Sequence, residues 1–327
     1  MINLQKSNSH DVNEKISQKL KAVNEKTKNY IKDVVILVNR EIGINKILSI
    51  LLFGSQQTQN KLENTLVSDC DLLFIFKDRV SSHHIREIEK YFIALELKHN
   101  FGNSNKNIVS NLLSSIQHAT GMFISHFLTK EKYWNNASFH KIFQVNKVFS
   151  ALFAPRHIVL SNVVINSTIL YGTDLRNKIR PKIRVSVYEM FKSMVMNLFI
   201  SFFALLIFPI KKLKSIKYQL ESIKWSLRSS NYYCFRDAAN LDKIIERFVS
   251  VEKYSTQKKA HQFFNNFLKL RQNPYNEIRF ILHCPIRILK IHIKAIKYRK
   301  AVKKGRGHIP SDPHYRIEPG HSFPLQF

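Results

Sequence analysis

Apolar residues in the first half of the chain predict short buried strands between amphipathic helices. Two apolar runs, ILSILLF and LLFIF, are too short and too continuous for surface helices. The patterns predict strands over 46–53, 70–76, 122–128 and 170–172, and helices over 11–39, from 82 onward, and over 107–118, 136–153 and 156–165. The order helix, strand, strand, helix, strand fits a small mixed sheet with helices packed against it.

Beyond Arg180-Pro181 the pattern becomes almost purely helical. Helices are expected over 237–251 and 256–271, in addition to a long apolar segment at 194–210. That segment is close to the lower length limit for a membrane span. Because it contains Asn197, Ser201 and Pro209, we favour a buried bundle helix over a membrane segment. The predicted fold class is therefore α+β: a mixed sheet with helices, followed by an all-α helical bundle.

The last predicted helix is basic and amphipathic. From Arg279 to Gly307 the sequence contains no acidic residue. One helical stripe carries basic residues: Arg287, Lys290, Lys294 and Lys297. The adjacent stripe is apolar and is expected to cover the edge of the core: Ile286, Leu289, Ile293 and Ile296. The basic stripe is a candidate surface for nucleic acid or another anion. An anionic membrane, or simply a solvated lysine face, would fit the same pattern.

The first two predicted strands bracket a glycine turn and a pair of carboxylates. The first strand stops at Gly54-Ser55, and Asp69 and Asp71 open the second after thirteen intervening residues. Residues i and i+2 of a strand point to the same face, so the two carboxylates project together. Paired oxygen ligands suit hard divalent cations such as Mg²⁺, and glycine lets backbone N–H groups approach a phosphate closely.

This arrangement resembles the polymerase-beta-like nucleotidyltransferase superfamily, in which Gly-Ser follows one strand and Asp-x-Asp opens the next. The segment reads LLFGSQQTQNKLENTLVSDCDLLFIF, with Ser68 before the first aspartate. The resemblance implies that Gly54, Ser55 and Ser68 bind the nucleotide, and that Asp69 and Asp71 bind Mg²⁺ or Mn²⁺. It further implies transfer of a nucleoside monophosphate from an NTP substrate to an acceptor hydroxyl. RNA or protein is slightly favoured as the acceptor.

The third carboxylate of that superfamily has no clear counterpart on a later strand. The best later strand, 122–128, carries Ser125 and His126 instead. His126 is a candidate catalytic base or metal ligand, or else a structural histidine in an apolar strand. Two functions therefore remain open. One is a metal-dependent nucleotidyltransferase; the other is a nucleotidyltransferase fold that has lost turnover and binds a nucleotide or RNA.

Charge and cysteine content indicate the type of partner and the compartment to expect for the protein. The 327 residues carry a formal charge of +29, which favours an anionic partner such as a nucleotide, a nucleic acid or an anionic membrane surface. Among these partners the membrane is the least favoured. Lysine-rich helix faces that only contact water are the alternative. The three cysteines are scattered, so neither a disulfide framework nor a zinc site is indicated, and a reducing cytoplasm is expected.

The expected domain organisation follows these patterns. Residues 1–10 are polar and expected to be disordered, without an apolar signal region. Residues 11–178 are expected to form the nucleotidyltransferase-like domain, and residues 182–304 the helical bundle that ends in the basic helix. Residues 305–327 contain several Pro, Gly and His residues and are expected to form an extended tail.

Overall fold

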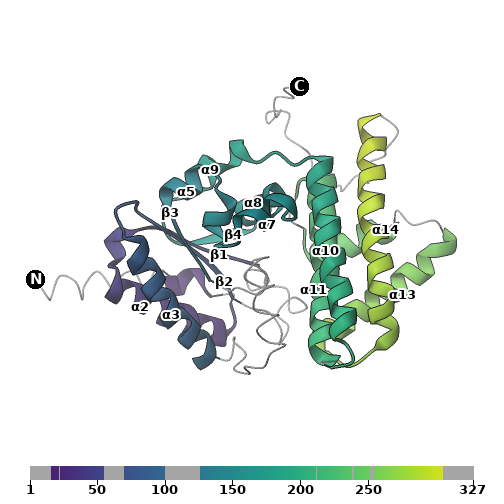
Figure 1. Ribbon diagram of the computed structural model, residues 1–327, viewed down its shortest axis with the longest axis horizontal. Coiled ribbons are helices and arrows are strands. Elements are labelled where there is room, and N and C mark those ends of the chain that lie inside the picture. The colour runs from purple at the N-terminus through teal and green to yellow at the C-terminus, as the bar shows by residue number, and fades with distance from the viewer. Residues whose placement is uncertain are drawn as a thin grey trace, which may run out of the picture.

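The computed structural model describes residues 16–21, 23–54, 70–99, 126–210, 212–237, 239–250 and 254–304. The segments expected to be disordered (1–10), helical (107–118) and extended (305–327) lie outside these residues. The described part contains a sheet flanked by helices and, beside it, a group of long helices (Figure 1). The predicted α+β class is confirmed.

A mixed sheet organises the first part of the molecule. Its described strands lie in the order β3-β2-β1-β4, with bounds Ile47–Phe53 (β1), Asp71–Phe76 (β2), His126–Lys130 (β3) and Ser167–Gly172 (β4). β1 pairs antiparallel with β2 and β4, whereas β3 runs parallel to β2. The mixed sheet expected from the sequence is therefore present, and its third strand extends beyond the predicted end at residue 128.

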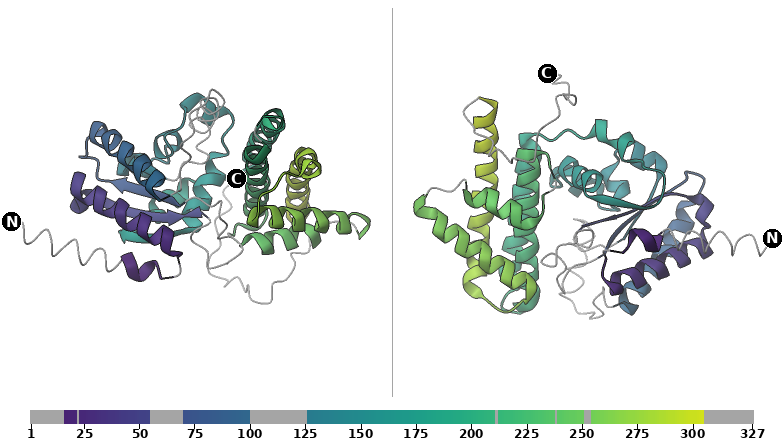
Figure 2. Two further views of the ribbon diagram at one scale, coloured as in Figure 1. Left: turned by 90° about the horizontal axis from the view of Figure 1, so that it is seen from below. Right: turned by 180° about the vertical axis from the view of Figure 1, so that it is seen from behind.

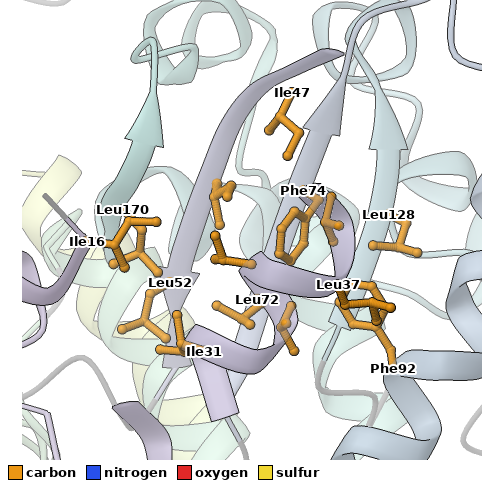
Figure 3. Close-up of a cluster of buried hydrophobic side chains, with 14 of the residues drawn as sticks. Ile16, Ile31, Leu37, Ile47, Leu52, Leu72, Phe74, Phe92, Leu128 and Leu170 are labelled. Atoms are coloured by element: carbon orange, nitrogen blue, oxygen red, sulfur yellow. The ribbon is translucent and has the colours of Figure 1, made fainter. Parts of the chain in front are cut away.

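Two helices cover one face of the sheet, α2 (Glu25–Glu41) and α3 (Ser82–Lys98). Figure 3 shows Leu72 and Phe74 of β2 in one buried apolar cluster with Phe92 of α3, and the ring centroids of Phe74 and Phe92 lie 5.5 Å apart. The helix predicted over 11–39 is interrupted, because Asn24 is extended and its side chain accepts a hydrogen bond from the Thr27 N–H (2.8 Å). That capping bond starts a new helix.

Short helices cover the other face of the sheet, where a second apolar cluster contains Trp134. They are α5 (Glu131–Asn135), α6 (Phe139–Ile142), α7 (Lys147–Leu152), α8 (Arg156–Ile165) and α9 (Arg176–Ile179). The helical structure predicted over 136–153 is present as two short helices, α6 and α7. Ala137 and Gln144 have φ of 49° and 52°, a left-handed conformation that breaks an α-helix.

Long helices form the second part of the molecule (Figure 2). They are α10 (Val187–Ile207), α11 (Lys212–Phe235), α12 (Leu241–Ser250), α13 (Tyr254–Gln272) and α14 (Ile278–Lys303). Helices α10, α11 and α14 pack against one another. Among the described residues, α10 is the one helix long and apolar enough to span a membrane by length and composition, and half of its apolar window is buried.

The contacts among α10, α11 and α14 include buried polar side chains. Ser193 of α10 donates to the hydroxyl of Ser229 of α11 (2.8 Å), and His292 Nε2 of α14 lies 3.2 Å from the Ser193 oxygen. Further along α10, Ser201 and Gln219 exchange two hydrogen bonds. These polar groups are buried but satisfied, which is the condition for placing them inside a bundle.

The orientation of α14 differs from the expected one. Its buried side is formed by Ile281, Ile288 and Ile291, whereas Ile286 and Ile293 are exposed. The prediction that Ile286 and Ile293 face the core was therefore wrong. The physical reason is that α14 has apolar residues on more than one side, and contacts with α10 and α11 select which side is buried.

Candidate functional site

The candidate site lies at one end of the sheet. β1 ends at this end of the sheet, and β2, β3 and β4 begin there. Phe53 pairs with Asp71 on one side and with Ser167 on the other. Directly paired residues point to the same face, so the three side chains form one row across the sheet. Asp71 is partly exposed at the start of β2, where an acid can reach a ligand from solution.

Gly54 and Asp71 are in direct contact at this end of the sheet. Gly54 has φ of 81°, in the left-handed region that favours glycine. A Cβ atom at Gly54 would lie 1.9 Å from Asp71 Oδ2 and 2.9 Å from Asp71 Cγ. Only a residue without a side chain leaves room for the carboxylate in this position. The end of the first strand and the start of the second are thus brought together as the sequence motif predicts.

The other motif residues lie outside the described part of the chain: Ser55, Ser68 and Asp69. Their predicted roles remain predictions. Cys70 is fully buried in the apolar cluster beneath α2 and α3, together with Leu72. The next residue, Asp71, points to the opposite face because side chains alternate along a strand. The expectation that Cys70 points into the core is confirmed, and its side chain lies on the face opposite to that of Asp71.

His126 does not share a face with Asp71. It pairs with Leu72, so it points towards α3 on the side that Leu72 occupies. Its Nδ1 lies 2.6 Å from Glu96 Oε1, and its ring centroid lies 4.9 Å from that of Phe92. The structure therefore separates His126 from the Asp71 carboxylate by the sheet itself. This placement favours a structural histidine over a base beside Asp71, and a catalytic role of His126 stays a prediction.

The histidine partner Glu96 was missed by the sequence reading. It lies four residues after Phe92 on the inward stripe of α3, and an acid on an otherwise apolar stripe is the signal that would have found it. Tyr30 of α2 donates to the same carboxylate at 3.5 Å. Burial, followed by the Glu96 charge, raises the pKa of Tyr30 well above its usual value. Tyr30 therefore stays protonated and acts as a donor.

The described residues contain no group of three or more His, Cys, Asp or Glu side chains that could hold a metal ion. Asp71 nevertheless fits one ligand of a hard cation. Its carboxylate lies at a partly exposed strand end, in the space that the missing side chain of Gly54 leaves. The second carboxylate of the motif, Asp69, would have to complete the pair.

The structure divides the predicted basic stripe of α14. Lys290 and Lys297 are exposed, whereas Lys294 is partly buried. The Arg287 guanidinium lies over the rings of Phe263 (4.9 Å) and Phe264 (5.5 Å) on α13. The four residues therefore do not form one continuous exposed surface. An anion surface on α14 remains a prediction that would rest mainly on the two exposed lysines.

No protein-family model and no curated protein match the chain. Among solved structures it is similar to the spectinomycin adenyltransferase AAD(9) from Enterococcus faecialis, crystallised with ATP and spectinomycin. The sequences are 10% identical, the TM-score is 0.47, and the match covers 82% of this chain and 98% of that chain. At this level the similarity supports no conclusion about the fold family or the function of this chain.

Proposed function

We propose that this protein is a metal-dependent nucleotidyltransferase, with residues 11–178 as its catalytic domain. The observation that carries the proposal is the contact of Gly54 with Asp71 at the sheet end. It places a glycine turn, whose backbone can approach phosphate, against the carboxylate of an Asp-x-Asp motif.

In the proposed reaction an acceptor hydroxyl attacks the α-phosphorus of an NTP. The new O–P bond forms as the bond from the α-phosphorus to the oxygen bridging to the β-phosphate breaks, so pyrophosphate leaves with that electron pair and the proton of the hydroxyl passes to water. Asp69 and Asp71 would hold Mg²⁺ or Mn²⁺, which neutralises charge on the phosphates. Gly54 and Ser55 would position the nucleotide so that attack occurs in line. The proposal assigns no role to His126, whose side chain lies on the face of the sheet that Leu72 occupies.

The test uses NTPs labelled at the α-phosphate, with RNA, protein and small hydroxylated compounds as acceptors. Asp71→Asn should lower label transfer by more than about a hundredfold, since even the groups that support a metal ligand are worth 10- to 100-fold. Asp78→Asn is the matched control. Asp78 is an exposed acid just beyond the other end of β2 and accepts a hydrogen bond from the Lys132 N–H (3.0 Å).

Calorimetry of Mg²⁺–ATP binding gives a readout that does not need the acceptor. Wild type and Asp78→Asn should bind, and Asp71→Asn should not. Equal transfer by the two variants would refute the assignment of the site. If nucleotide binding depends on Asp71 but no acceptor is ever labelled, the protein is a nucleotide-binding module rather than an enzyme.

A further inference from the structure

Helix α10 carries large apolar residues on its exposed side as well as on its buried side. Its outer side carries large apolar residues, with Phe202 54% and Leu206 76% exposed, together with Tyr188, Phe191 and Phe199. Its buried side contains apolar residues such as Ile200 and Ala204, and also several polar ones: Glu189, Lys192, Ser193, Asn197 and Ser201. A surface helix of a soluble bundle normally turns its apolar stripe to the core. Helices that face lipid instead pack through small and polar residues.

The buried polar residues of α10 are held by specific partners. Glu189 Oε2 accepts a hydrogen bond from the His157 N–H (2.8 Å), and the Lys192 amine donates to the carbonyl of Ala151. These bonds fix the rotation of α10 about its own axis. The large apolar side chains on the opposite side of α10 are therefore held facing outward.

Helix α14 adds basic residues to an outward apolar side. Ile278, Leu282, Ile286 and Ile293 are all exposed. The exposed residues among and beside them include Arg279, Lys290, Lys297 and Lys300. No Asp or Glu occurs between 190 and 220 or between 278 and 304. An apolar stripe flanked by cationic side chains is the pattern of a helix that lies in a membrane interface.

We propose that the outer face of α10 and α14 docks on the surface of a membrane that contains anionic lipids. The two helices are packed neighbours, in contact through Ser193 and His292. In this mode the apolar side chains enter the boundary between headgroups and acyl chains. Lys290 and Lys297 contact lipid phosphates. The proposal does not depend on the site at the sheet end.

Two other occupants fit this face less well. A nucleic acid would satisfy the lysines but would leave the exposed isoleucines and phenylalanines against a charged backbone. A second copy of the chain would satisfy the apolar side chains but would bring two cationic faces together, because a two-fold interface uses the same patch on both subunits. An anionic bilayer satisfies both kinds of side chain at once.

The test is sedimentation of the full chain with vesicles of phosphatidylcholine alone or mixed with phosphatidylglycerol. Binding should require the anionic lipid and should weaken as salt rises. Lys290→Gln with Lys297→Gln should weaken binding by about 20- to 30-fold, from the usual contribution of a basic residue near an anionic surface. Lys19→Gln with Lys21→Gln is the charge-matched control, because both lysines are exposed near the other end of the chain.

The apolar contribution is tested separately. Phe199→Ser with Phe202→Ser should weaken binding by at least about tenfold, because two large exposed side chains no longer enter the lipid. Val148→Ser with Leu152→Ser, which removes exposed apolar residues from α7, should bind like wild type. Circular dichroism melts establish that each variant is folded. Asp71→Asn should also bind like wild type, which separates this result from the fate of the proposed enzyme.

Three outcomes would overturn the proposal. The first is vesicle binding that is equal for both lipid compositions or unaffected by the two apolar substitutions on α10. The second is a dimer in solution that Phe199→Ser with Phe202→Ser converts to a monomer, which would assign the face to a second copy. The third is binding to single-stranded RNA that depends on Lys290 and Lys297 in a protein that ignores anionic vesicles.

Discussion

Replacing Gly54 by alanine separates the role of this residue in folding from its role at the site. The added Cβ would lie 1.9 Å from Asp71 Oδ2, and real Cβ contacts are not shorter than 3.0 Å. The carboxylate oxygen must therefore retreat by at least about 1.1 Å, the difference between these two distances. The clash is with the end of a side chain, so rotation of Asp71 relieves it. The remaining cost is that of a left-handed alanine, about 1–2 kcal/mol of unfolding free energy.

Gly172→Ala is the matched control. Gly172 has the same φ of 81° but lies at the other end of β1, where it pairs with Ser49. Its Cβ would lie 2.0 Å from the Leu48 carbonyl oxygen and 2.8 Å from the Leu48 carbonyl carbon, both of which are backbone atoms. Because backbone cannot rotate away, Gly172→Ala should lose more stability than Gly54→Ala.

The assay combines urea unfolding, followed by circular dichroism, with nucleotidyl transfer at a temperature where both variants are folded. Displacing a site residue by about 1 Å commonly costs about a hundredfold in rate. Gly54→Ala should therefore lose about a hundredfold in transfer at a small cost in stability. Gly172→Ala should show the reverse. The reasoning is refuted if Gly54→Ala transfers label as fast as wild type, or if the two variants lose activity in proportion to their lost stability.

Three further predictions concern buried polar groups. Burial lowers the pKa of His292 to about 4 from an ordinary 6.5. The free energy of unfolding should therefore fall as the pH drops from 6.5 towards 4, by about 2 kcal/mol at pH 5. In urea titrations, His292→Gln should remove this pH dependence. Burial acts to raise the pKa of Asp237, but hydrogen bonds, first of all from Arg247, outweigh burial and lower the pKa. Stability should therefore be lost as the pH falls below 3.8, the ordinary pKa of an aspartate. Asp237→Asn should reduce the fall in melting temperature at acid pH in a series of thermal melts. Glu96→Gln should cost about 1–3 kcal/mol in urea unfolding, and Glu87→Gln, which changes a solvent-exposed ion pair on the same helix, should cost clearly less.

Local patterns in the sequence were sufficient for much of the fold. The apolar runs of β1 and β2 are long, continuous and bounded by polar residues, so their existence and approximate ends could be predicted. Ser81 caps α3 as expected, since a serine before an amphipathic segment is a local signal. The contact of Gly54 with Asp71 follows from the antiparallel pairing of two strands that are adjacent in the sequence.

The face on which His126 lies could not be predicted in this way. It depends on the register between β2 and β3, and a shift of one residue would turn His126 to the side of Asp71. That register is set by packing between strands separated by about fifty residues of chain, so no local pattern reports it. The helix breaks at Ala137 and Gln144 could not be predicted from a local pattern either, because neither alanine nor glutamine signals a left-handed backbone.

For helices α10 and α14, the side that faces inward could not be predicted from the sequence either. Periodicity along a helix tells which residues share a side, but it does not tell which side faces inward. On α14 there are apolar residues on both the buried side, at Ile288, and the exposed side, at Ile286. On α10 apolar residues again lie on both sides, with Ile200 buried and Phe202 exposed, and the buried side also contains hydrogen bonds such as that from Ser201 to Gln219. From the sequence, the apolar segment (α10) was interpreted as a bundle helix and the basic helix (α14) as an anion surface. Because the two helices pack against each other, one membrane-docking surface can account for both.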